Sequence, residues 1–369
     1  MKIEVLLYIY LFVCAGMIVF NIVTAAVLRR KDKRTVRISN DLRGKVALEL
    51  SSIKNGGEIN AEHKKYLCKK LKRIGNMLAF DKMLESAYVE DPENVRAYLG
   101  GLDGVFISLA IDYCGKNRIE TAYFPYIIKK YRIIADRPFP SIVGMLLGLL
   151  GEESVYCREN ALQALYTTGD AACVIKAVKI IDSSDLFLHG KLLSDGLLNF
   201  AGSSSALNEK IIENFETFSD AMKVVLLNYF RFSSGEYREF AFELLSDENR
   251  DDEIRYACIR YLGKYPLEKA YSLLAELAGI SDNAEWEYAA IASTALSAYP
   301  GDETAERLKN NLYSPNWYIR CNSADSLKAL GFTYSQLADV IDGNDRYASE
   351  ILRYRFERAD AAEKENAVC

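Results

Sequence analysis

Residues 251–266 read DDEIRYACIRYLGKYP, and residues 314–332 read SPNWYIRCNSADSLKALGF. Both stretches place a polar residue four positions before an arginine and apolar or small residues three, six and seven positions after it. A proline or glycine follows eleven positions after the arginine. Such spacing lies on one face of an α-helix, and the flanking residues are typical of helix ends. Each stretch therefore predicts one amphipathic helix.

The same plan recurs through the second half of the chain at intervals of 33, 32, 32, 34 and 31 residues. The register positions are Arg158, Lys191, Lys223, Arg255, Ala289 and Arg320. Good helix N-caps stand four positions before most of them, namely Ser154, Ser219, Asp251 and Asn316. A second amphipathic stretch follows each first helix. Because one helical hairpin cannot bury its apolar face alone, neighbouring hairpins must stack. The sequence predicts an all-α fold with an α-α superhelix of about six repeats over residues 151–356.

These strings resemble HEAT repeats of armadillo-like α-solenoid proteins, of a membrane-anchored bacterial type. The shared pattern is an apolar-Arg pair, spaced small residues and a closing Leu-Gly, over about residues 152–341. The resemblance implies a ladder of basic residues that bond between neighbouring repeats. Arg158, Arg255 and Arg320 match it directly, Lys191 and Lys223 match less well, and Ala289 breaks it. The family implies a fold and a habit of binding proteins, but no activity.

A membrane anchor is predicted near the N-terminus, because residues 5–28 are 24 consecutive uncharged positions. As a helix they would extend about 36 Å, enough to cross a hydrocarbon core of about 30 Å. A signal peptide has a shorter apolar stretch, and a buried soluble helix has more polar positions. The flanking basic residues are Arg29, Arg30, Lys31, Lys33, Arg34 and Arg37. Basic flanks stay in the cytoplasm, so we expect a single-pass protein of the cell membrane with residues 1–4 outside and the C-terminal domain inside.

Three further segments complete the predicted organisation. Residues 29–37 form a basic juxtamembrane segment, residues 38–150 an irregular helical cap, and residues 357–369 a polar tail. The cap is expected to hold six helices, near 40–54, 60–75, 76–89, 93–114, 119–135 and 141–151. The basic run at 63–73 has two interpretations: a solvated helix face with leucines packed inside, or a surface that lies on anionic headgroups.

Charge and composition exclude several classes of function. Residues 1–37 carry seven Lys/Arg and two Asp/Glu, and the remainder carries 39 and 49, a net charge of −10. Such an acidic domain is a poor nucleic-acid binder. Two histidines and eight widely spaced cysteines leave no zinc or redox spacing, and no phosphate loop, nucleophile elbow or kinase signature occurs. We therefore expect no catalytic, metal or cofactor-binding residues, and a protein that is not an enzyme.

The chain holds 24 tyrosines and two tryptophans. Most tyrosines are expected to pack between repeats with the hydroxyl reaching water. Trp286 and Trp317 both stand three positions before a register position, so stacking should bring them close together. With Tyr318, they are the predicted partner-binding residues, since Trp and Tyr dominate interface hot spots.

The leading hypothesis is a non-enzymatic scaffold whose cytoplasmic repeats hold a protein partner at the bilayer. A membrane-embedded enzyme such as a polysaccharide-making glycosyltransferase is one such partner class. Two alternatives stay open. One is an enzyme accessory, or a protein like the HEAT-type bilin lyases, that binds a small ligand in its groove. The other is an anchor that associates with copies of itself.

Overall fold

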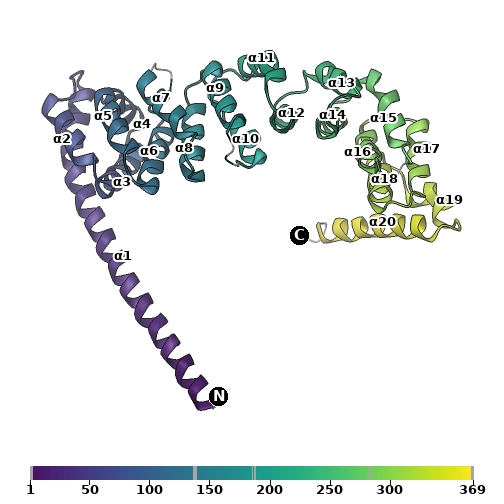
Figure 1. Cartoon of the computed structure of the whole chain (residues 1–369), viewed down its shortest axis with the longest axis horizontal. Coiled ribbons are helices and arrows are strands. Elements are labelled where there is room, and N and C mark those ends of the chain that lie inside the picture. The colour runs from purple at the N-terminus through teal and green to yellow at the C-terminus, as the bar shows by residue number, and fades with distance from the viewer. Residues whose placement is uncertain (1–2, 136–138, 185, 187, 282–283, 367–369) are drawn as a thin grey trace. The chain divides into compact units, whose positions relative to one another are not determined.

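The computed structural model describes residues 3–135, 139–184, 186, 188–281 and 284–366, and within these residues it is built of helices without a strand (Figure 1). The all-α class is confirmed. The chain divides into two compact units, Met1–Leu186 (unit 1) and Phe187–Cys369 (unit 2). The division therefore follows the first predicted repeat rather than preceding it.

The described residues of unit 1 form nine helices: α1 Ile3–Lys54, α2 Ala61–Leu71, α3 Ile74–Glu90, α4 Pro92–Gly100, α5 Asp103–Cys114, α6 Arg118–Lys130, α7 Pro140–Leu149, α8 Val155–Tyr166 and α9 Ala171–Asp182. The C-terminal part of α1 packs on α3 and α4, and α2 packs on α3 and α5. Helix α6 packs along α8, which also contacts α7 and α9. The first predicted repeat is thus continuous with the core of the irregular helices.

Helix α1 is the longest element, with 52 residues. It joins three predicted segments, 5–28, 29–37 and 40–54, into one uninterrupted helix. Its apolar part has a mean hydropathy of 2.5 over 18 residues, none of them buried, and is long and apolar enough to cross a membrane. Figure 1 shows this part leaving the helical body of unit 1 as a free helix. The basic segment continues the helix because Arg and Lys are good helix formers.

The other end of α1 is fixed in the core of unit 1. Leu42 and Val46 are buried, and the side-chain amide of Asn94 on α4 donates to the carbonyl of Leu50 at 3.1 Å. Ser39 is the first residue of α1 that unit 1 buries. The apolar helix and the helical body are therefore joined without a flexible segment.

The single helix expected near 93–114 is two helices, α4 and α5, whose axes differ by 70°. The break falls at Gly101-Leu102. A Cβ atom on Gly101 would lie 2.6 Å from Cδ1 of Ile59, so a larger residue here would require the Ile59 side chain to move. The bend places Leu102 and Val105 in the core.

A buried carboxylate organises the centre of unit 1. Asp81 on α3 accepts hydrogen bonds from the hydroxyls of Tyr123 at 2.6 Å and Tyr131 at 2.7 Å, and from Nζ of Lys130 at 2.8 Å. Burial and the Asp81 carboxylate both raise the pKa values of the two tyrosines above the ordinary value. Asp81 thereby ties α3 to α6 and to the turn that follows it.

Unit 2 is a series of helical hairpins. Its α-helices are α10 Gly190–Leu197, α11 Ser204–Asn214, α12 Asp220–Ser233, α13 Arg238–Ser246, α14 Asp252–Lys264, α15 Tyr271–Ala278, α16 Trp286–Ala295, α17 Asp302–Asn311, α18 Trp317–Ala329, α19 Ala338–Ile341 and α20 Arg346–Asn366. Short 3₁₀ helices lie at Phe215–Thr217, Glu268–Ala270, Leu296–Ala298 and Tyr334–Leu337.

The predicted N-caps of these hairpins and of α8 are confirmed. The side chains of Ser154, Ser219, Asp251 and Asn316 each accept a hydrogen bond from a backbone N–H in the first turn of the following helix. His189 caps α10 in the same way, with Nδ1 accepting from the backbone N–H of Lys191 at 3.2 Å.

Each hairpin consists of a first helix (α10, α12, α14, α16 or α18) and the second helix that follows it in the chain. The first helices pack on one another in this order, and α18 packs on α20. Buried tyrosines bind the hairpins that begin with α14 and α16 to the hairpin before each of them. The Tyr261 hydroxyl donates to the Ser234 carbonyl at 2.7 Å and accepts from the Tyr237 N–H at 3.0 Å. The Tyr299 hydroxyl makes the same pair of bonds to Leu262 and Leu267. The abundance of tyrosine in this unit thus satisfies backbone groups in the turns.

Replacing Asp81 by alanine should lower the free energy of unfolding by about 2–4 kcal/mol, because two hydroxyls and an ammonium lose a shared buried acceptor. The thermal midpoint of the full chain in detergent, followed by far-UV circular dichroism, measures this. Asp81→Asn keeps one acceptor oxygen and should lose less. Equal midpoints for Asp81→Ala and the unchanged chain would contradict the organising role.

Candidate functional site

The arginines of the predicted ladder bond the turn that precedes their own helix. Nη1 of Arg158 donates to the carbonyls of Glu152 at 2.7 Å and Glu153 at 3.0 Å. Nη1 of Arg320 contacts the carbonyls at the same two offsets, at 2.6 and 3.0 Å. The first of these turns joins α7 to α8, and the second joins α17 to α18. The two arginines therefore satisfy backbone acceptors in the turn before their own helix.

Arg255 reaches a neighbouring hairpin directly. Its Nη1 donates to the Tyr288 hydroxyl at 3.0 Å, and its guanidinium lies 4.9 Å from the centre of the Tyr288 ring. Its Nε donates to the Leu245 carbonyl at 3.2 Å. The Tyr288 hydroxyl in turn donates to the Asp252 carboxylate at 2.6 Å. This is the inter-hairpin contact that the ladder predicts.

The two lysines of the ladder differ. Lys223 is buried and pairs with Asp220 at 3.1 Å and Glu216 at 3.5 Å. Glu216 also accepts two hydrogen bonds from Arg250 at 2.8 Å, and these lower the pKa of its carboxyl. Lys191 is exposed. The weaker match at Lys191 thus has the weaker structural role.

Trp286, Trp317 and Tyr318 lie together and form the aromatic cluster. The rings of Trp286 and Tyr318 stack with centroids 5.1 Å apart, and the Trp317 ring meets Tyr318 edge-on at 5.1 Å. Trp317 and Tyr318 are 49% and 54% exposed. Two large aromatic side chains are therefore presented to solvent at the first turn of α18.

Trp286 differs from its two neighbours because it is half-buried. It packs against the buried residues Ala289, Ala290 and Ile319. It also lines a cavity of about 200 Å³ between the turn that ends α15 and the start of α18. Changing Trp286 would therefore disturb packing, whereas Trp317 is the cleaner probe of the surface.

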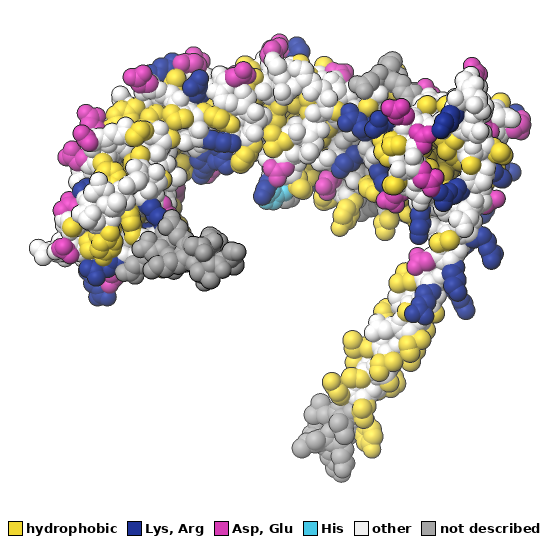
Figure 2. Space-filling view, turned by 180° about the vertical axis from the view of Figure 1, so that it is seen from behind, with side chains coloured by type: hydrophobic (Ala, Val, Ile, Leu, Met, Phe, Trp, Pro, Cys, Tyr) yellow, Lys and Arg dark blue, Asp and Glu magenta, His cyan; other side chains and the backbone are white. Residues whose placement is uncertain are grey.

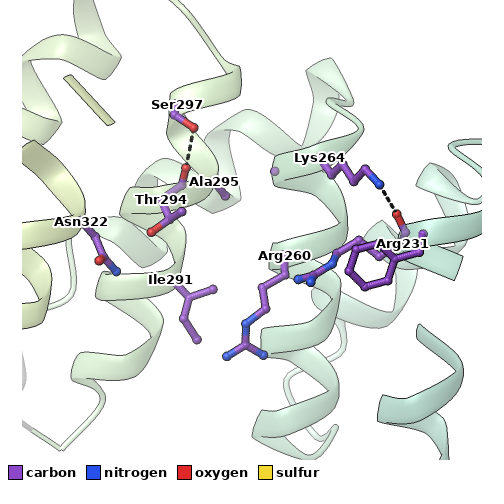
Figure 3. Close-up of a pocket in the computed structure, with 10 residues that line it drawn as sticks. Arg231, Arg260, Lys264, Ile291, Thr294, Ala295, Ser297 and Asn322 are labelled. Atoms are coloured by element: carbon purple, nitrogen blue, oxygen red, sulfur yellow. Dashed lines mark hydrogen bonds between the residues drawn. The ribbon is translucent and has the colours of Figure 1, made fainter. Parts of the chain in front are cut away.

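A second feature of unit 2 is a larger cavity of about 590 Å³, called here the cationic pocket. It lies on the first helices of consecutive hairpins, and its lining residues are Arg231, Phe232, Arg260, Gly263, Lys264, Ile291, Thr294, Ala295, Ser297 and Asn322. Figure 3 shows Arg231 and Arg260 extending into one space opposite Ile291, Thr294 and Asn322. Among the described residues, three cations and no carboxylate line it.

Contacts within the pocket hold its cations in place. Nζ of Lys264 donates to the Arg231 carbonyl at 2.8 Å (Figure 3). The Arg231 guanidinium and the Lys264 ammonium lie 4.8 and 5.0 Å from the centre of the Phe232 ring. Burial and the charge of Arg260 lower the pKa of Arg231. The pocket is a site of positive potential on a chain whose net charge is negative.

These cations were not predicted as site residues, although the sequence contains a signal for them. Counted from the register positions of α12, α14 and α16, seven of the nine pocket residues that follow them stand at offsets of five, eight or nine, and Ile291 and Ala295 are the exceptions. Those nine positions hold Arg231, Arg260 and Lys264 and no Asp or Glu. Comparing the same offsets in successive repeats would have revealed this set of positions, which holds cations and no acidic residue.

The six basic residues predicted beside the membrane all lie on α1, between the apolar part and the packed part. Each of the six is exposed. Figure 2 shows the change along this helix from yellow apolar side chains to dark blue basic ones. Residues 29–38 extend about 15 Å as a helix, which is more than one headgroup layer of about 5–8 Å.

The basic helix α2 runs antiparallel to the end of α1. The backbone N–H of Asn60 donates to the Glu49 carboxylate at 2.9 Å, and Nζ of Lys45 lies 3.8 Å from the centre of the Tyr66 ring. Leu67 and Leu71 are buried, as the packed interpretation requires. The basic end of α2 therefore lies nearer the apolar part of α1 than its beginning does.

The chain matches no family model, and no curated protein is similar to it. Among the residues that the structure describes, no group of three or more His, Cys, Asp or Glu side chains is placed to hold a metal ion. The function of this protein is therefore inferred from the surfaces described above.

The ladder contacts predict opposite outcomes for two similar changes. Arg255→Ala should lower the free energy of unfolding by about 1–3 kcal/mol, because bonds to Leu245 and Tyr288 are lost. Lys191→Ala also removes one positive charge, but from an exposed site, and should change the free energy of unfolding by less than about 0.5 kcal/mol. Thermal unfolding of the two variants in parallel measures the difference. Equal losses would show that the register position has no ladder role.

Proposed function

We propose that this protein is a membrane-anchored, non-enzymatic scaffold that holds a protein partner at the cytoplasmic face of a membrane. In this proposal α1 spans the bilayer with its N-terminus outside. The hairpins from α8 onward are HEAT-like repeats stacked into an α-solenoid. The continuity of α1 is the observation that carries the proposal, since a joint-free helix fixes a protein domain to a bilayer at a set distance.

The charges of α1 support the orientation. Six exposed basic residues follow the apolar part, and cytoplasmic flanks carry such an excess. The ten residues 29–38 separate the bilayer from the first packed position, Ser39. Unit 1 would then stand about one headgroup layer away from the lipid surface, which leaves room for a partner that is itself embedded in the membrane.

The aromatic cluster supports a role in binding protein. Exposed Trp317 and Tyr318 lie on α18, one of the first helices that pack in a row. Tyr and Trp supply large contact areas with few rotatable bonds, which is why they are enriched at interface hot spots. A membrane-embedded enzyme such as a glycosyltransferase is the partner class that we consider first.

Capture of a partner tests this proposal. Crosslinking in intact cells, followed by purification through a C-terminal tag, should recover one membrane protein in near-stoichiometric amount. Trp317→Ala should abolish this recovery with little change in thermal midpoint, because the side chain is half exposed. Tyr156→Ala, an exposed aromatic on α8, is the matched control and should retain it. Trp286→Ala should lower the midpoint, since that ring packs against Ala289 and Ile319.

Recovery of the tagged chain alone, or only of copies of itself, would rule out the scaffold in this form. If Trp317→Ala and Tyr156→Ala reduced partner recovery equally, the aromatic cluster would not be the specific binding site.

The orientation can be tested with the exposed thiol of Cys114. A membrane-impermeant maleimide should leave Cys114 unmodified in intact cells and label it after permeabilisation, as read from the peptide by mass spectrometry. The expected protection follows from a cytoplasmic unit 1. Cys114→Ser confirms the assignment of the labelled peptide, and labelling in intact cells would reverse the topology.

A further inference from the structure

The cationic pocket gathers positive charge without a counter-ion. No carboxylate of the described residues lies within ion-pair distance of Arg231, Arg260 or Lys264. Potential partners are not scarce, because the chain has 51 Asp and Glu against 46 Lys and Arg. Other cations of unit 2 form ion pairs with carboxylates, such as Arg250 with Glu216 at 2.8 Å. Like charges that share a pocket repel one another, so this arrangement favours an added anion.

The cations are positioned before any anion arrives. Phe232 lies beside both Arg231 and Lys264, and the negative face of an aromatic ring attracts cations. The bond from Lys264 to the Arg231 carbonyl fixes α14 against the end of α12. Donors that are already oriented bind an anion without a further ordering cost.

The floor of the pocket depends on a close helix contact. A Cβ atom on Gly263 would lie 2.8 Å from Cα of Ala295, so glycine allows α14 and α16 to approach at this point. The contact brings Arg260 of α14 opposite Thr294 of α16. The two walls of the pocket are thereby held at a fixed separation.

We propose that the cationic pocket binds a phosphate-bearing small molecule, with the phosphate between the guanidinium groups of Arg231 and Arg260. The inference concerns unit 2 alone and does not depend on the anchor or on the partner of the aromatic cluster. Guanidinium groups match the oxygens of a phosphate in pairs of hydrogen bonds, and three cations suit a group that carries about two negative charges.

The opposite wall indicates the rest of the ligand. The Ser297 hydroxyl donates to the Thr294 carbonyl at 2.7 Å, and the Asn322 amide donates to the Ala290 carbonyl at 2.8 Å. The one donor of Ser297 is in use, so its oxygen can only accept from a ligand, whereas Asn322 keeps one N–H donor and its Oδ1 acceptor. With Ile291 beside them, this wall suits a body that carries hydroxyl groups, which both donate and accept.

The size of the pocket favours a small molecule over a polypeptide. A volume of about 590 Å³ lies within the range of about 300–1,000 Å³ that is typical of small-ligand sites. A polypeptide segment would place most of its length outside the cations.

Calorimetric titration of the full chain in detergent with pyrophosphate, at constant ionic strength, tests the proposal. We expect saturable binding and a raised thermal midpoint. Arg260→Gln should weaken binding about ten- to hundredfold, since it removes charge-assisted hydrogen bonds. Lys191→Gln removes a charge from another exposed site of unit 2 and should bind as the unchanged chain does.

Three results would overturn the assignment. Pyrophosphate could fail to bind saturably, or Lys191→Gln could weaken binding as much as Arg260→Gln, which would indicate general charge attraction. A poly-glutamate peptide could bind more tightly than pyrophosphate through Arg260, which would make the pocket a site for protein segments.

The stability of the ligand-free variants separates binding from a structural role. Arg260→Gln should leave the thermal midpoint unchanged or raise it, because it relieves repulsion on Arg231. A lowered midpoint would make Arg260 a structural residue and would contradict the proposal. Loss of pyrophosphate binding with partner capture intact would separate this site from the scaffold role.

Discussion

Unit 2 depends on the burial of α12, α14 and α16, each between the first helices before and after it, and of α18 between α16 and α20. Leu262 on α14, Ala292 on α16 and Leu327 on α18 have no exposed surface, and no single hairpin could enclose them. The tyrosine hydroxyls and the arginines of the register positions then satisfy the turn carbonyls and N–H groups that this stacking buries. Apolar burial supplies the driving force, and these bonds fix the register between hairpins.

A fixed register has consequences for the surface. Side chains at equivalent positions of consecutive first helices fall into rows, as Trp286 and Trp317 do. Around the cationic pocket, Arg231 stands in one row with Gly263 and Phe232 in another with Lys264. The pocket and the aromatic cluster are both products of such rows, one from the ends of α12 and α14 and the other from the starts of α16 and α18. A mutation that shifted one hairpin would therefore disturb both surfaces together.

Local features were predictable from the sequence, and features that depend on contacts between hairpins were not. The N-caps at Ser154, Ser219, Asp251 and Asn316 and the two-helix plan of each repeat follow from short-range chemistry. The bend at Gly101 was missed although the pair Gly100-Gly101 is a short-range signal for a turn. The pocket was missed because its cations come from different helices.

The continuous α1 was also only partly predictable. An apolar segment and a basic segment were each recognised, but residues such as Arg29 and Lys31 are compatible with a helix or a loop. The helical form is favoured from the C-terminal part of α1, where Leu42 and Val46 are buried in unit 1 and hold the helix in place. The sequence also suggested that Trp286 and Trp317 are equivalent, yet their different burial gives them different roles.

A helix without a joint transmits rotation as well as distance. Each residue of an α-helix turns the chain by about 100°. In a chain anchored as proposed, the number of residues between the bilayer and Ser39 would set the direction in which unit 1 faces about the axis of α1. Adding or removing one residue in 29–38 would move unit 1 by only about 1.5 Å along the helix but would swing it more than a quarter of a turn. The length of this segment therefore determines the rotation of unit 1 about the axis of α1. Insertions that complete whole helical turns should be tolerated better than those that do not.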